Sequence, residues 1–235
     1  MLNVILKFIV CFPYILWLWL IDRRDRKGKV HLYGIYGFFG LPGAGKTISM
    51  IRHLNDYREK YGDQIYIMTN FNYNNQDFEF TDWRQLLKTY DKPLVVAWDE
   101  IQNVFASRNF KDFPIQLLTL LTQVRKGNGI QILYTSQRWH FVDKNFRSLS
   151  FGCYDCKTYL GRYTVYSMFD SEDYDQKCST VEVDKKVRIK AKCRYSFIQT
   201  RKERKAFDSY KMLLTAKAKD YMTREELAKI ENGVI

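Results

Sequence analysis

The sequence contains no internal repeats and no long low-complexity linker, so it does not indicate a solenoid or an extended disordered region. Cysteine is scarce: five residues, an odd number spread along the chain, do not fit a secreted disulfide framework. Acidic residues are also few, with 26 Asp and Glu against 38 Lys and Arg, which gives a net charge of +12. This imbalance predicts an anionic partner, either nucleic acid or lipid headgroups.

The chain does contain enough apolar material for a packed core. Its 235 residues are 46% hydrophobic and 16% aromatic, which is typical of a folded globule rather than of disorder. This length accommodates one large domain with a small appendage.

One stretch fits the phosphate-loop pattern G-x-x-x-x-G-K-[ST] at every fixed position: Gly40-Leu41-Pro42-Gly43-Ala44-Gly45-Lys46-Thr47. Residues 31–39 before it predict a strand, and residues 48–57 after it predict a helix. The glycines allow backbone N–H groups to turn inward, and the helix N-terminus adds a positive dipole. In this pattern Lys46 reaches the β- and γ-phosphates, the Thr47 hydroxyl binds Mg²⁺, and Ile48 begins the helix at the nucleotide. We therefore expect ATP and Mg²⁺ as cofactors.

A second motif indicates hydrolysis as well as binding. Residues 94–98 form an apolar run that ends in Asp99-Glu100, about fifty residues after the loop, as in a Walker B strand. Asp99 is expected to hold the Mg²⁺ shell, and Glu100 to polarise the attacking water. A helix over 114–126 and a strand over 130–135 follow. Gln137, just after that strand, is a candidate sensor of the γ-phosphate, and a simple strand-capping role is equally open.

Hydrolysis of this kind also uses a cation that stabilises the transition state. Arg125, Arg138 and Arg147 are the candidate arginine fingers, although most arginines are solvated surface residues. Arg125 is preferred because it ends the predicted helix before the next strand.

The amino terminus carries an apolar run over residues 2–21, about the length that a bilayer crossing needs, although its uninterrupted part is only 8–21. A basic cluster follows at 23–29 and predicts that everything after it stays in the cytoplasm. The features of a cleavable signal peptide are missing. We expect a single-pass or interfacial anchor in the host cytoplasmic (inner) membrane, with a buried core helix as the alternative.

After residue 150 the sequence changes character. Residues 159–168 predict a strand, 170–175 an acidic loop, and 187–195 a strand with apolar and basic residues on opposite faces. The basic residues of 185–205 predict contact with DNA or with an anionic membrane, a solvated edge being the alternative. Four cysteines, Cys153, Cys156, Cys178 and Cys193, give only a weak zinc signal, because the second pair lacks C-x-x-C spacing. A capping box at 223–226 opens a short terminal helix.

Several of these segments together are similar to zonula occludens toxin-like (Zot) ATPases: residues 40–47, 98–105, 107–108, 123–126, 134–137, 142–143 and 147, with a looser echo at 207–211. The resemblance covers about residues 32–151. It implies an inner-membrane P-loop ATPase needed for the assembly and export of filamentous phage, with kinship to hexameric DNA-pumping ATPases. The implied partners are further copies of the chain up to a hexamer, phage DNA or a DNA–protein complex, and other phage assembly proteins. Family members often carry the membrane span after the ATPase domain, whereas here the apolar run comes first.

We therefore expect an α/β P-loop NTPase with a mostly parallel sheet flanked by helices, an amino-terminal membrane helix and a small β-rich extension. The expected domains are the anchor at 1–29, the ATPase domain at 30–150 and the basic extension at 151–235. Two other functions stay open. One is a DNA-packaging or conjugative DNA translocase of the same superfamily, and the other is a nucleotide-gated assembly scaffold that does not hydrolyse ATP.

Overall fold

The computed structural model describes residues 2–25, 30–105, 114–179 and 189–206. The chain divides into two compact units, residues 1–31 and residues 32–235, and each is described by itself. The terminal helix predicted after residue 223, the echo at 207–211 and the motif residues 107–108 lie outside the described residues.

The described residues of the first unit contain one helix, α1 (Leu2–Asp25), which includes Pro13. Its large apolar side chains are exposed where they are described; Trp17, for example, is 55% exposed and Trp19 is 49% exposed. Within the described residues, no helix combines the length and the apolar character that a membrane crossing requires. The predicted transmembrane helix is therefore not supported. The uninterrupted apolar part of the run, residues 8–21, is short for a span.

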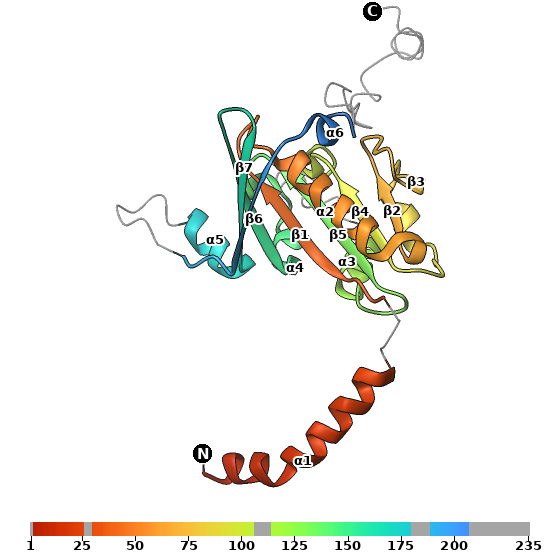
Figure 1. The fold of residues 1–235 in the computed structure, drawn as a ribbon, viewed down its shortest axis with the longest axis vertical. Coiled ribbons are helices and arrows are strands. Elements are labelled where there is room, and N and C mark those ends of the chain that lie inside the picture. The colour runs from red at the N-terminus through yellow and green to blue at the C-terminus, as the bar shows by residue number, and fades with distance from the viewer. Residues whose placement is uncertain (1, 26–29, 106–113, 180–188, 207–235) are drawn as a thin grey trace, which may run out of the picture. The chain divides into compact units, whose positions relative to one another are not determined.

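The second unit is built on one eight-stranded sheet with the order β3-β2-β4-β5-β1-β6-β7-β8 (Figure 1). Six of its strands are parallel: β1 (Gly34–Phe39), β2 (Tyr66–Thr69), β3 (Phe78–Glu79), β4 (Leu94–Trp98), β5 (Ile130–Ser136) and β6 (Gly152–Tyr159). Two antiparallel strands, β7 (Tyr163–Phe169) and β8 (Cys193–Ile198), complete it. The mostly parallel sheet that the sequence predicts is confirmed.

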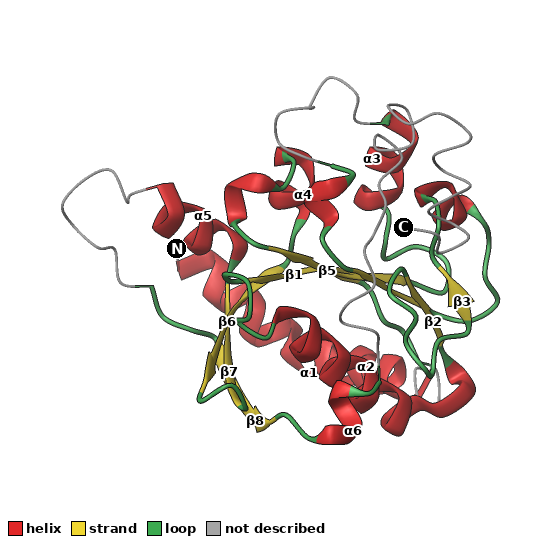
Figure 2. Cartoon of the chain, turned by 90° about the horizontal axis from the view of Figure 1, so that it is seen from above, coloured by secondary structure: helices red, strands yellow, loops and turns green. Residues whose placement is uncertain are grey.

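Helices cover both faces of this sheet, as Figure 2 shows. On one face lie α2 (Lys46–Tyr61) and α6 (Arg201–Arg204). On the other lie α3 (Ile115–Thr122), α4 (Lys144–Leu149) and α5 (Ser171–Ser179). Because both faces are covered, β4 is apolar along its whole length and every one of its residues is buried.

The last strands continue the sheet of the nucleotide domain, because β6 pairs directly with β1. The domain boundary expected at residue 150 falls between α4 and β6 and stays a prediction. The predicted strand over 159–168 is in fact the turn and second arm of a hairpin, in which Leu160 and Gly161 adopt positive φ between β6 and β7. The predicted acidic loop is wrong: residues 171–179 form α5. Asp170 Oδ1 accepts from the Glu172 N–H at 3.2 Å, and acidic residues occupy the first turn, where the helix dipole favours them.

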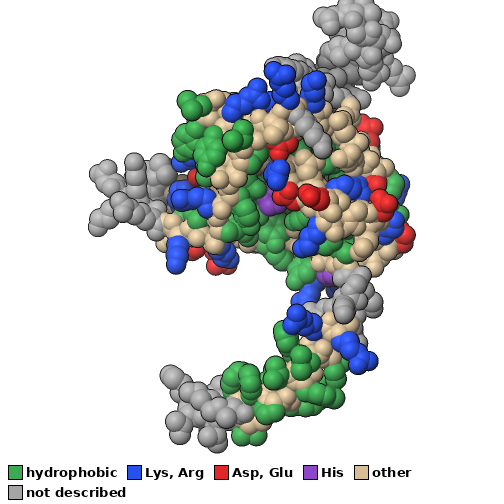
Figure 3. Space-filling model, viewed as in Figure 1, with side chains coloured by type: hydrophobic (Ala, Val, Ile, Leu, Met, Phe, Trp, Pro, Cys, Tyr) green, Lys and Arg blue, Asp and Glu red, His purple; other side chains and the backbone are tan. Residues whose placement is uncertain are grey.

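The predicted basic strand over 187–195 is also displaced, since β8 begins only at Cys193. Lys192 lies before the strand and pairs with Asp170, while residues 187 and 188 are outside the described part. Of the basic residues expected on one strand face, Arg194 lies on β8, whereas Lys190 and Lys192 precede it. Exposed basic side chains gather instead over α6 (Figure 3), where Arg201, Arg204 and Lys205 are exposed.

An aromatic cluster packs α2 against the sheet around His53. The imidazole Nε2 is buried and makes no hydrogen bond with a described residue. Burial lowers the pKa of His53 to about 4, because charging the ring would place an unpaired cation in an apolar site. The rings that surround it come from α2, β1, β6, β7 and β8: Tyr57, Phe38, Tyr154, Tyr166 and Tyr195.

This burial predicts a pH-dependent stability. The folded state keeps His53 neutral, so the unfolded state gains protons first as the pH falls below about 6.5. The free energy of unfolding should therefore drop by about 1 kcal/mol between pH 7 and pH 5.5 through this residue alone. Urea unfolding of wild type and His53→Phe at both pH values measures the difference. The exposed His140→Phe variant is the control and should keep the wild-type slope. Equal slopes for wild type and His53→Phe would contradict the assignment.

Candidate nucleotide-binding site

The P-loop connects β1 to α2 at the carboxyl end of the central strand. Three of its glycines have positive φ: Gly40 (151°), Gly43 (79°) and Gly45 (85°). These values favour glycine because a Cβ is strained there. Inside the loop the Ala44 N–H donates to the Leu41 carbonyl at 3.0 Å, and α2 begins immediately at Lys46. The predicted strand–loop–helix arrangement is thus present.

Lys46 lies buried against the loop. Its Nζ donates to the Leu41 carbonyl oxygen at 3.3 Å. Burial lowers the pKa of Lys46, and the nearby Asp99 carboxylate opposes this effect. A cation held under a loop of backbone N–H groups creates an anion site, and phosphate oxygens would be stronger acceptors for it than a loop carbonyl.

Asp99 follows β4 directly and meets the P-loop helix. Its Oδ1 accepts from the Thr47 hydroxyl at 2.9 Å and from the Thr135 hydroxyl at 2.5 Å. Burial raises the pKa of the Asp99 carboxyl, while these two hydrogen bonds lower it. The other oxygen, Oδ2, makes no hydrogen bond with any residue in the described part of the chain.

The residues present fit Mg²⁺. A hydroxyl and a carboxylate lie side by side, with one carboxylate oxygen free, and Mg²⁺ typically uses one or two such protein oxygens together with waters and phosphates. Thr47 and Asp99 are the residues that would hold it. Elsewhere in the described ranges, no cluster of three or more His, Cys, Asp or Glu side chains is arranged to hold a metal ion.

Glu100 adopts a left-handed conformation, with φ 51° and ψ 52°. Its backbone N–H donates to the Thr135 hydroxyl at 2.9 Å, and its carboxylate accepts from the Asn103 amide at 3.1 Å. A non-glycine residue held at positive φ by a specific hydrogen bond is typical of functional positions. The backbone conformation therefore fixes the direction in which the Glu100 side chain leaves the chain, at the same edge of the sheet as Asp99.

Two residues of the site are not predicted by either motif. Thr135, near the end of β5, donates to Asp99 and accepts from Glu100, so it joins the two Walker B acids. Asn70, just after β2, makes two hydrogen bonds with the Asp99 backbone, at 2.8 and 3.1 Å. The available signal was their position: each is a polar residue at the carboxyl end of a strand that neighbours β4.

For the other predicted site residues, Gln137 and Arg125, the structure gives no contact with the P-loop or the Walker B acids among the described residues. Gln137 follows β5 and is half-buried. Arg125 stacks on the ring of Tyr33, 5.7 Å from its centroid. Because Tyr33 precedes β1 and the P-loop follows it, Arg125 lies at the opposite end of the sheet from the loop. As a finger it could act only on a neighbouring copy.

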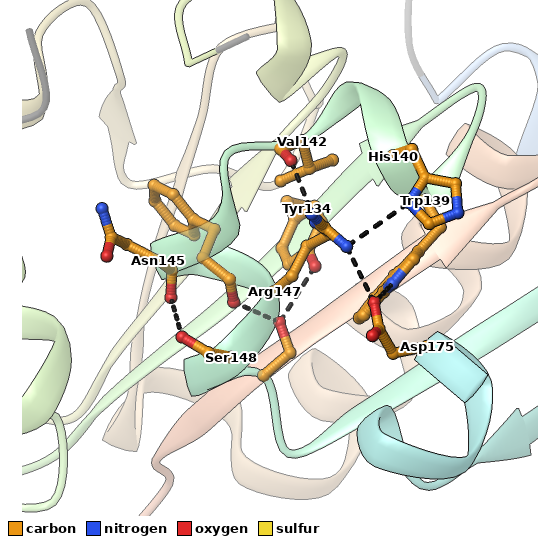
Figure 4. A network of polar contacts seen from close by, with 10 residues as sticks. Tyr134, Trp139, His140, Val142, Asn145, Arg147, Ser148 and Asp175 are labelled. Carbon is orange, nitrogen blue, oxygen red and sulfur yellow. Dashed lines mark hydrogen bonds and ion pairs between the residues drawn. The ribbon is translucent and has the colours of Figure 1, made fainter. Parts of the chain in front are cut away.

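Arg147 is committed to an internal network, as Figure 4 shows. Its guanidinium pairs with Asp175 at 2.8 Å and donates to the Val142 carbonyl at 3.2 Å. It also lies over the ring of Trp139. A finger must reach outward, so this network argues against Arg147. Arg138, two residues after β5, is exposed.

The cysteines do not converge. Cys153 and Cys156 are both buried on β6, but their spacing places them on opposite faces of the sheet. Burial raises the pKa of the Cys156 thiol to about 12. These two residues therefore cannot share one zinc ion.

The parallel sheet with helices on both faces, and the P-loop at the end of its central strand, define the class: this is a P-loop NTPase fold.

Comparison with solved structures finds chains of similar fold. In fold the chain is similar to the N-terminal domain of zonular occludens toxin from Neisseria meningitidis, with a TM-score of 0.51 and 20% identity over 75% of this chain and 100% of that one. It is also similar to the genome packaging NTPase B204 from Sulfolobus turreted icosahedral virus 2 in complex with AMPPCP, with a TM-score of 0.44 and 10% identity over 60% and 93% of the two chains. No family model and no curated protein matches the sequence. The Zot resemblance seen in the motifs is confirmed at the level of the fold.

The P-loop geometry generates a matched pair of substitutions. A Cβ at Gly45 would lie 2.5 Å from Thr158 Oγ1, whereas a Cβ at Gly43 would meet nothing within 4 Å. Both positions have positive φ, so both carry the conformational cost of about 1 kcal/mol. Gly45→Ala should lower the free energy of unfolding by about 1–3 kcal/mol more than Gly43→Ala. Urea denaturation measures this, and equal losses would refute the close packing of the loop on β6.

Proposed function

We propose that this protein binds Mg²⁺·ATP in the P-loop and hydrolyses it. The observation that carries the proposal is the 2.9 Å hydrogen bond between Thr47 Oγ1 and Asp99 Oδ1. It joins the two oxygen ligands contributed by two motifs that lie 52 positions apart in the chain. A glycine-rich turn without a nucleotide-binding role would not be expected to place a hydroxyl in hydrogen-bond contact with the acidic end of a strand.

The geometry of the site supports a role for each residue. The loop N–H groups and Lys46 bind the phosphates, while Thr47 and Asp99 hold Mg²⁺. Bound Mg²⁺ would neutralise charge on the β- and γ-phosphate oxygens. Glu100 orients the attacking water or accepts its proton. Thr135 fixes both acids relative to each other, and Gln137, just after β5, is the proposed sensor of the γ-phosphate.

We further propose that turnover drives the assembly and export of a filamentous phage. Two features support this: the Zot-like motifs of the sequence and the fold shared with the Zot domain. Phage DNA or a DNA–protein complex is the proposed cargo, and other phage assembly proteins are the proposed partners. The net charge of +12 and the exposed basic residues over α6 suit such an anionic cargo. A self-assembled ring, with a hexamer as the expected form, would bring Arg125 to a neighbouring site.

The localisation proposed is the cytoplasmic face of the host membrane. The support is the exposed apolar surface of α1, which includes Trp17 and Trp19, followed by Arg23 and Arg24. Apolar and aromatic side chains beside basic ones suit an interfacial helix on anionic lipid.

The ATPase proposal is tested by Lys46→Ala. This variant should turn over ATP at under about 1% of the wild-type rate, because it removes the cation that contacts the phosphates. Lys88→Ala, an exposed lysine on the same unit, is the matched control and should keep full activity. The full chain is assayed with and without single-stranded DNA. Wild-type turnover no higher than that of Lys46→Ala would contradict the proposed ATPase activity.

Glu100→Gln separates an ATPase from a nucleotide-gated scaffold. The substitution removes the carboxylate that acts on water but leaves the phosphate contacts intact. We expect kcat to fall by about 10²–10³ while nucleotide affinity stays within about threefold. If Glu100→Gln supports phage assembly as well as wild type does, hydrolysis is not what drives assembly. DNA-stimulated turnover with directional movement on preformed DNA would instead favour a translocase.

Membrane attachment has its own test. The full chain should float with vesicles that contain anionic lipid, and replacing Trp17 and Trp19 together by Ser should reduce the bound fraction several-fold, since both indoles are exposed. Flotation that is indifferent to this double substitution would remove α1 from the proposal.

A further inference from the structure

A chain of buried and half-buried polar side chains connects the P-loop to the segment before α6. Thr158 Oγ1, near the end of β6, donates to the Ala44 carbonyl at 3.0 Å. It lies 2.9 Å from Thr164 Oγ1 on β7, which accepts from Gln199 Nε2 at 2.8 Å. Thr164 is fully buried and Gln199 is 6% exposed. We call these residues (Thr158, Thr164 and Gln199) the hydroxyl–amide chain.

The two ends of this chain fix the direction of every hydrogen in it. Gln199 Oε1 accepts from the Arg204 guanidinium at 2.7 and 3.0 Å. A guanidinium only donates, so the amide oxygen must face Arg204 and the amide nitrogen must face the threonines. At the other end the Ala44 carbonyl only accepts, so Thr158 donates to it. The Thr164 hydroxyl must then donate to Thr158, and each hydrogen points from Arg204 toward the P-loop.

The atom at the end of the chain controls the loop. The Ala44 carbonyl and the Gly45 N–H belong to one planar trans peptide, in which they point in opposite directions. Holding the carbonyl on Thr158 therefore turns the Gly45 N–H away from β6. Phosphate loops bind anions through N–H groups turned in this way. The positive φ of Gly45 and its close approach to Thr158 keep the peptide in this orientation.

The segment from β8 to α6 also contacts α2, the helix that follows the P-loop. Glu203 of α6 is buried, caps its own helix through Thr200, and pairs with Arg52 of α2 at 3.0 Å. Because α2 begins at Lys46, the segment from β8 to α6 is tied both to the P-loop and to the helix that carries Lys46. Arg201 and Arg204 of α6 are exposed, so this segment is accessible to solvent.

We propose that Thr158, Thr164 and Gln199 are positioning residues of the nucleotide site. They hold the Ala44–Gly45 peptide in its phosphate-binding orientation, and they couple the placement of α6 to nucleotide affinity. The inference rests on the proposed function, since it requires that the P-loop binds phosphates. None of the three residues belongs to the P-loop or to the Walker B motif.

The test measures the Kd of a fluorescent ATP analogue with Mg²⁺, together with KM and kcat, in the full chain. Thr158→Val keeps the shape but loses the hydroxyl, so Kd and KM should each rise about tenfold with a smaller change in kcat. Thr158→Ser restores the hydroxyl and should return both to within about twofold of wild type. Thr119→Val is the matched control, because it deletes a threonine-to-carbonyl hydrogen bond of the same 3.0 Å length on α3. It should leave Kd unchanged.

Gln199→Leu gives the sharper result, because Gln199 makes no contact with the P-loop among the described contacts and can act on it only through the threonines. It should raise Kd about fivefold or more, and the double variant with Thr158→Val should raise it by less than the product of the two single effects. A wild-type Kd for Gln199→Leu, or exactly multiplicative effects, would overturn the proposal. If Thr158→Val does not fold, the Kd values of Gln199→Leu and Thr158→Ser test the proposal. Wild-type protein that binds no ATP would refute the proposed function instead.

Discussion

The structure of the site depends on the alignment of parallel strands at one edge of the sheet. Strands β1, β4 and β5 lie side by side and run in the same direction, so their carboxyl ends deliver the P-loop, Asp99 and Thr135 to the same place. Each of these groups comes from a segment far from the others in the chain. The 2.9 Å hydrogen bond from Thr47 to Asp99 is the direct result of this register.

Burial and polarity are balanced at this edge. β4 is apolar throughout, but polar residues lie where it and its two neighbouring strands end. Asn70 bonds the Asp99 backbone, and Thr135 bonds both acids. An unpaired carboxylate in this position would be costly, and its hydroxyl donors reduce that cost. The hydroxyl–amide chain applies the same solution behind the P-loop, where a loop carbonyl would otherwise face the buried side of the sheet.

The sequence predicts the parts of this structure that a local motif defines, and it does not predict the parts that depend on strand order. The P-loop and Asp99-Glu100 were predictable because a local pattern defines them. Thr135, Asn70 and Thr158 were not, because their importance depends on strand order, and no local pattern reveals which strand neighbours β4 or β1. The acidic composition of 170–175 predicts a loop, but acidic residues in a first turn also stabilise a helix, and α5 begins there. The basic strand was misplaced because alternation shows a strand's period better than its ends.

The central claim is that Thr47 and Asp99 together form the Mg²⁺·ATP site, and calorimetric titration of ATP into the full chain tests it most directly. Titrations with Mg²⁺ and with a chelator give the gain in affinity due to the metal. We predict that wild type shows a gain of about tenfold or more. Thr47→Val and Asp99→Asn should each abolish most of that gain, and the double variant should lose no more than either single one. A metal-dependent gain that survives in both single variants would contradict the account.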